Sequence, residues 1–183
     1  APIGFVYNPD LSKLYEADYG SGNVTVIDGL ADTVLTTVAG GSSPHRLCYN
    51  PVNSKVYVGD DDIGMMLIDC AADTLITADE LYAVDVAYNP VNNRVYGALE
   101  DEFIVIDGAT NEILAEQDFG YYARSVCVAD SGRRAFATAD EDNMVGVLDC
   151  QSDSLTSEVA TQGRLSALCL DPVNPLGLTM SDA

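Results

Sequence analysis

The chain has 183 residues, 48% of them hydrophobic, so it is long and apolar enough to bury a substantial core. Its 29 acidic residues outnumber 8 basic ones, and the net charge of −21 argues against partners such as nucleic acid or anionic lipid, whose binding depends on Lys and Arg. No apolar run approaches the roughly 20 residues of a membrane-spanning helix, so no membrane insertion is expected.

One pattern recurs about every 40 residues. Each repeat opens with a Tyr-Asn-Pro tripeptide or a degenerate form of it, has an aromatic residue or leucine eight positions later, and continues to an Ile/Leu-Asp pair in each of the first four repeats. The openings are Tyr7-Asn8-Pro9, Tyr49-Asn50-Pro51, Tyr88-Asn89-Pro90, Val128 and Leu170-Asp171-Pro172. A period of this length built from short strand-like segments is typical of propeller blades.

The second repeat illustrates the predicted elements. Short β-branched and aromatic runs predict strands, and the Asn-Pro and Asp-rich segments between them predict turns. The four predicted strands are His45–Tyr49, Lys55–Val58, Met65–Ile68 and Thr74–Thr77. Such a four-stranded antiparallel sheet cannot bury both of its faces alone, so neighbouring repeats must stack.

The sequence therefore predicts an all-β fold, a single β-propeller of about four and a half four-stranded antiparallel blades, with about 18 strands and almost no helix. The expected blades are residues 3–43, 44–82, 83–122 and 123–164, with a partial blade at 165–183. An incomplete blade exposes a strand edge. We therefore expect a protein partner, a further stretch of chain or a second copy to complete the open propeller, and head-to-tail association of copies is one alternative.

A basic residue recurs two positions before the aromatic residue of each predicted second strand. The pairs are Lys13 and Tyr15, Lys55 and Tyr57, Arg94 and Tyr96, and Arg134 and Phe136. A cation at one fixed repeat position predicts a structural role, in which it pairs with acids of a neighbouring blade.

Two segments carry a family resemblance. Tyr57-Val58-Gly59-Asp60 with Met66–Asp69 resembles the YVTN-type β-propeller repeat of surface-layer and other exported proteins, and the third strands Val24–Gly29 and Phe103–Gly108 are closer still. The resemblance covers the whole chain and implies a location outside the cell or at its surface. It specifies the blade rather than an activity.

The loops between predicted second and third strands are acidic in every full repeat and should share one face of the propeller. The candidate metal ligands there are Asp60, Asp61, Asp62, Asp140 and Asp142. Calcium, which takes six to eight oxygen ligands, is the one cofactor considered. The alternative is a solvated acidic rim, because no loop has the spacing of a known calcium motif.

His45 is the only histidine, and it precedes Arg46 at the start of a predicted strand. Arg124 occupies the equivalent place two repeats later. These three residues are the candidate ligand-binding residues, although an ordinary polar role at the channel mouth is the alternative. No motif supplies a triad around His45, so no catalytic residue is predicted.

Cysteines recur in pairs in the second and fourth repeats. The pairing suggests Cys48–Cys70 and Cys127–Cys150 disulfides. First and third strands lie roughly 9–10 Å apart at the usual strand spacing, however, and a disulfide needs Cα atoms within roughly 7 Å. Buried thiols are the alternative.

The sequence favours a non-catalytic β-propeller scaffold, exported and serving structural or binding roles at a cell surface. The alternative is a cation-dependent ligand-binding or hydrolytic propeller that uses the acidic loop face and His45.

Overall fold

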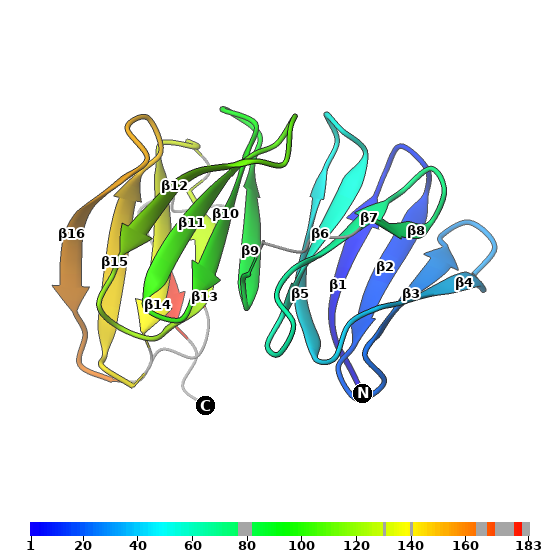
Figure 1. The fold of residues 1–183 in the computed structure, drawn as a ribbon, viewed down its shortest axis with the longest axis horizontal. Helices are drawn as coiled ribbons and strands as arrows, with labels where there is room; N and C mark the ends of the chain where they lie inside the picture. The colour runs from blue at the N-terminus through cyan, green and yellow to red at the C-terminus, as the bar shows by residue number, and fades with distance from the viewer. Residues whose placement is uncertain (77–81, 130, 140, 164–167, 171–177, 181–183) are drawn as a thin grey trace. The chain divides into compact units, whose positions relative to one another are not determined.

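The computed structural model describes residues 1–76, 82–129, 131–139 and 141–163, together with the backbone of two short strands, 168–170 and 178–180. This part of the chain contains 18 strands and no helix, as the sequence predicted (Figure 1). Accordingly, no segment among these residues is a helix that could span a membrane.

The strands form four antiparallel four-stranded sheets and one two-stranded sheet, each following chain order. Sheet 1 contains β1 (Pro2–Asn8), β2 (Lys13–Asp18), β3 (Asn23–Asp28) and β4 (Thr33–Ala39). Sheet 2 contains β5 (Pro44–Asn50), β6 (Lys55–Asp60), β7 (Met66–Asp69) and β8 (Thr74–Ile76). Sheet 3 contains β9 (Asp85–Asn89), β10 (Arg94–Leu99), β11 (Glu102–Asp107) and β12 (Ile113–Asp118). Sheet 4 contains β13 (Ala123–Val128), β14 (Arg134–Ala139), β15 (Met144–Asp149) and β16 (Ser154–Ala160), and the last sheet pairs β17 (Leu168–Leu170) with β18 (Leu178–Met180).

The Tyr-Asn-Pro openings make the first turn of sheets 1, 2 and 3. The Asn8 side-chain oxygen accepts hydrogen bonds from the backbone N–H groups of Asp10 and Leu11, at 3.0 and 3.2 Å. The Asn50 and Asn89 side-chain oxygens accept the corresponding bond from the residue two positions on, Val52 in sheet 2 and Val91 in sheet 3. An amide side chain that bonds its own backbone two or three residues on stabilises a tight turn, which explains why Asn recurs there.

The Ile/Leu-Asp pairs close the turn between third and fourth strands. In each sheet the aspartate accepts two backbone N–H bonds from residues two and three positions on, as Asp28 does from Leu30 and Ala31 at 2.8 and 3.0 Å. The other aspartates are Asp69, Asp107 and Asp149. Hydrogen bonds to the ionised form lower the pKa of Asp28, Asp107 and Asp149 below the usual range.

The structure divides into two compact units, residues 1–86 and 87–183, and the division falls inside β9. The sequence predicted one propeller domain without this division. Each unit is built around the packing of one sheet on the next, because a sheet buries a face only against a neighbour.

In the N-terminal unit, sheet 1 packs on sheet 2, with β1 lying against β5 (Figure 1). Tyr15, Val24 and Val26 of sheet 1 share one apolar core with Val56 and Ile68 of sheet 2, and all five are fully buried. Tyr15, the aromatic residue of the second strand, therefore lies between the two sheets.

In the C-terminal unit, sheet 3 packs on sheet 4. The Phe103 and Phe119 rings lie 5.3 Å apart, and a Cβ atom at Gly146 of β15 would come within 3 Å of both rings. The absence of a side chain at Gly146 thus allows the two aromatic rings to approach β15 closely.

Candidate functional site

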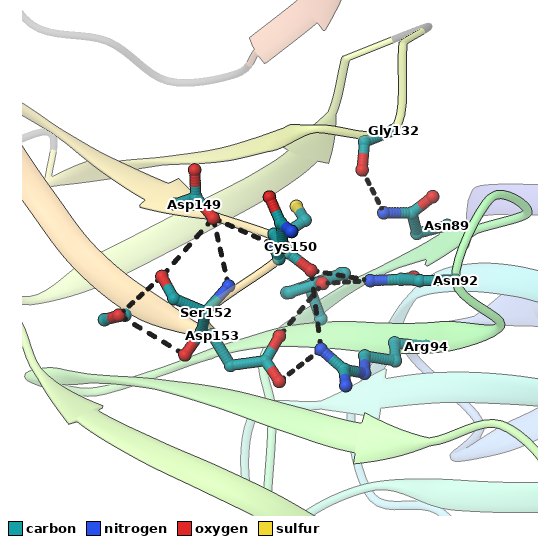
Figure 2. Close-up of polar contacts among 11 residues, drawn as sticks. Asn89, Asn92, Arg94, Gly132, Asp149, Cys150, Ser152 and Asp153 are labelled. Carbon is teal, nitrogen blue, oxygen red and sulfur yellow. Dashed lines mark hydrogen bonds and ion pairs between the residues drawn. The ribbon is translucent and has the colours of Figure 1, made fainter.

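The recurring basic residue joins neighbouring sheets in the C-terminal unit (Figure 2). Arg94 at the start of β10 forms an ion pair with Asp153, in the turn between β15 and β16, and reaches the Cys150 carbonyl oxygen. The Tyr96 hydroxyl donates to Asp153, and the Asn92 amide donates to Tyr96 and to the Cys150 carbonyl oxygen at 2.9 and 3.0 Å. We call this group of contacts the intersheet clamp.

The N-terminal unit contains the same clamp between sheets 1 and 2. The Lys13 ammonium group lies 2.7 Å from Asp73 and 3.0 Å from the Cys70 carbonyl oxygen, and the Tyr15 hydroxyl donates to Asp73 at 2.9 Å. Burial, reinforced by Cys70 and Asp73, raises the pKa of Tyr15 and keeps its phenol protonated as a donor. The predicted pairing of this cation with an acid of the neighbouring repeat is therefore confirmed for Lys13 and Arg94.

A second contact between sheets 3 and 4 joins the first turns of the two sheets. The Asn89 side chain donates to the Gly132 carbonyl oxygen at 2.8 Å (Figure 2). Gly132 has a positive φ of 62°, and a Cβ atom there would lie 2.6 Å from the Asn89 side-chain oxygen. A glycine is thus required where the degenerate fourth opening meets sheet 3.

The cysteine pairs are not bridged. Cys48, Cys70 and Cys150 are buried thiols, and Cys127 is a half-buried thiol. Cys48 lies on β5 and Cys70 follows β7, so β6 separates them, and the Cys70 turn faces Tyr15 of sheet 1. Burial raises the pKa of Cys48, so this thiol is protonated and unreactive at neutral pH.

The acidic loop of sheet 2 is bonded to the connection between sheets 1 and 2. Asp60 is only 2% exposed, and its carboxylate accepts four backbone N–H bonds of 2.9–3.2 Å from Ser42, Ser43, Asp62 and Ile63. The Asp62 carboxylate accepts the hydroxyl groups of both serines, at 3.2 and 2.6 Å. Asp60, predicted as a cation ligand, is instead buried and stabilises this connection through its hydrogen bonds.

The other predicted metal ligands do not form a site with Asp60. Asp61 is exposed, as is Asp142 in sheet 4, and Asp140 lies outside the described residues. Among the residues that the structure does describe, no three His, Cys, Asp or Glu side chains are grouped closely enough to hold a metal ion.

We therefore expect calcium to bind weakly. Titration calorimetry should show no submicromolar site, because a tight site needs six to eight oxygen ligands and Asp60 is saturated by backbone donors. Submicromolar binding that is lost in Asp61→Asn or Asp62→Asn, but retained in Glu158→Gln on the exposed strand β16, would contradict this expectation.

The predicted ligand-binding residues lie at strand irregularities. The register of β5 with β6 shifts between Pro44 and Leu47, which places His45 and Arg46 in a β-bulge. The register of β13 with β14 shifts around Arg124 in the same way. Bulges re-aim side chains and are frequent next to binding sites.

His45 and Arg124 belong to different compact units, and each is described with its own neighbours. The His45 ring is half-buried and meets the Tyr19 ring edge-on, with centroids 6.1 Å apart, whereas the Arg46 side chain is exposed. The Arg124 guanidinium group lies 5.6 Å from the centroid of the Tyr122 ring, which is cation–π distance.

Arg124 also lines an open cavity of about 260 Å³ together with Tyr122 and Glu141. Of these three cavity residues, the sequence predicted only Arg124 as a ligand-binding residue. Glu141 belongs to the acidic loop that was considered only as a metal site. Tyr122 lies in the connection before β13, where the repeat pattern does not single it out.

No family model and no curated protein sequence matches the chain. Solved structures, in contrast, match most of its length. Hydrazine synthase of Kuenenia stuttgartiensis superposes with a TM-score of 0.81 and 19% identity over 94% of this chain and 53% of that chain. A chain of the mitotic checkpoint complex superposes with a TM-score of 0.77 and 19% identity over 92% of this chain and 55% of that chain. Both are propellers with four-stranded blades.

The fold is a β-propeller. Sheets 1 to 4 are its blades, as the sequence predicted. At 19% identity the likeness shows the fold alone, and the propeller chain spans about half the length of the two solved chains. The propeller fold supports a scaffold or binding role in general, since propellers of one architecture serve many functions.

Proposed function

We propose that the chain is a non-catalytic propeller scaffold of the YVTN-type repeat, exported and acting in protein binding at a cell surface. The observation that carries the scaffold role is the use of its recurring polar residues: Lys13, Asp73, Arg94 and Asp153 hold neighbouring sheets together. The third-strand segments Val24–Gly29 and Phe103–Gly108 support the repeat type.

Each unit offers one exposed arginine for binding. These are Arg46 in the β5 bulge and Arg124 in the β13 bulge, on a protein that has only eight Lys and Arg residues in all. Arg and Tyr are enriched where protein partners bind most strongly, which favours the Tyr122–Arg124 pair as part of a protein interface.

The enzyme alternative is tested at His45. We expect purified protein to hydrolyse p-nitrophenyl acetate no faster than its His45→Ala variant, with or without calcium, because the His45 ring contacts Tyr19 and no triad motif surrounds it. Tyr19→Leu serves as a matched control for loss of the ring contact alone. Calcium-stimulated hydrolysis that disappears in His45→Ala would instead support a hydrolytic propeller.

The location is tested separately. Fractionation of the source cells should recover the protein in the surface or secreted fraction, and recovery inside the cell alone would remove the export part of the proposal while leaving the scaffold role standing.

A further inference from the structure

The two faces of sheet 1 have opposite environments. One face carries Tyr15, Val24 and Val26 and is buried against sheet 2. The other carries two cross-strand rows, Tyr7–Leu14–Ile27–Val34 and Phe5–Glu16–Thr25–Thr37. Phe5 is 74% exposed, Tyr7 48% and Val34 62%, so this face, which we call the open face, presents apolar side chains to solvent.

The equivalent face of sheet 2 is covered by sheet 1. Its row Tyr49–Val56–Ile68–Leu75 has the same register as the first open-face row. Val56 and Ile68 are fully buried in the core shared with sheet 1, and the Tyr49 hydroxyl donates to Asp10 of sheet 1 at 2.8 Å. Burial and this bond to Asp10 raise the pKa of Tyr49 to about 12.

The open face also carries the acceptor half of an intersheet clamp. Asp32 has the same place in its turn as Asp73 and Asp153, four residues after the turn aspartate, and the three have φ values of 52–53°. Asp73 and Asp153 are largely covered by Lys13 and Arg94, with 15% and 13% of their side chains exposed. The Asp32 side chain is exposed.

We propose that the open face of sheet 1 docks a further blade of the same repeat, whose second strand begins Lys/Arg-x-Tyr and whose basic residue pairs with Asp32. That strand supplies the phenol as well as the cation, as β2 and β10 do for sheets 2 and 4. The neighbouring first turn supplies an acceptor for Tyr7, as Asp10 does for Tyr49.

A second copy of residues 1–183 fits this face less well. In the amino-acid sequence of the fifth repeat, Leu176 and Leu178 stand at the positions of the clamp cation and tyrosine, so this repeat does not have the Lys/Arg-x-Tyr pattern. Two copies would also bring together chains of net charge −21, which repel each other. The two solved propellers match this chain over only about half of their own lengths, which is consistent with further blades beside such a module.

The proposal is tested by adding the blade. A second copy of residues 1–43, which contains Asp10, Lys13 and Tyr15, is joined ahead of Ala1, and thermal unfolding is recorded with and without Asp32→Asn in the original copy. We expect Asp32→Asn, which removes the charge but keeps one oxygen acceptor, to lower the melting temperature by about 2–4 °C in the extended chain and to leave the 183-residue chain unchanged. Asp61→Asn, at an exposed loop position, is the matched control and should affect neither chain. An equal effect of Asp32→Asn in both chains would overturn the proposal.

A second measurement does not require the extended chain to fold. Hydroxyl-radical footprinting compares the protein purified from its source with the isolated 183-residue chain, using the exposed Tyr82 as the reference. Oxidation of Phe5 should fall on the order of tenfold in the source protein as its ring is covered. Equal oxidation, or a dimer of the 183-residue chain that protects Phe5 by itself, would overturn the proposal. Neither result bears on export or on binding at Arg46 and Arg124, so the proposed function is judged independently.

Discussion

Asp153→Ala should lower the free energy of unfolding of the C-terminal unit by about 2–3 kcal/mol, because it leaves the Arg94 guanidinium and the Tyr96 hydroxyl without their shared acceptor at a partly buried site. Chemical denaturation followed by tyrosine fluorescence suits the measurement, since the chain has ten tyrosines and no tryptophan.

The control for this change is Asp118→Ala, which removes an exposed carboxylate from β12 in the same unit. It should change the free energy of unfolding by no more than about 0.5 kcal/mol. A similar loss in both variants would mean that general charge, rather than the clamp, sets the effect of Asp153.

Ile68→Ala should destabilise the N-terminal unit by about 2–5 kcal/mol, because Ile68 is fully buried in the core between sheets 1 and 2 and its removal leaves a cavity. Ile27→Ala is a close match: the residue type, the strand and the cross-strand row are equivalent, but Ile27 lies on the open face.

In the 183-residue chain we expect Ile27→Ala to cost less than about 1 kcal/mol, since only part of the side chain is covered. Equal losses at the two positions, measured by the same denaturation, would show that the open face is already packed and would contradict the structure.

The blade pattern was readable from the sequence because each turn encodes its own geometry. Asn8 and Asp28 bond their neighbouring backbone N–H groups and so specify turns without help from distant residues. Alternating apolar residues then place Tyr15, Tyr57 and Tyr96 at equivalent buried positions. Phe136 is only half-buried, which the repeat alone did not indicate.

The candidate sites were less predictable because they depend on contacts between repeats. Asp60 and Asp61 are adjacent and chemically identical, yet Asp61 is exposed whereas Asp60 is buried. The hydrogen-bond donors of Asp60 include Ser42 and Ser43, which lie in the preceding connection. Likewise the pairing of Lys13 with an acid was expected from recurrence. That Asp73 is the acid follows from how sheet 1 packs on sheet 2, which no local pattern encodes.

In both units, a basic residue at the start of one second strand, with the tyrosine two residues later, holds the aspartate turn of the next blade. A double-mutant cycle on Lys13 and Asp73, with Lys13→Met, Asp73→Ala and the combined variant, measures that contact directly. The structure predicts a coupling free energy of about 1–2 kcal/mol, because both side chains are about 15% exposed and their charged atoms lie 2.7 Å apart. Strictly additive effects of the two substitutions would contradict it.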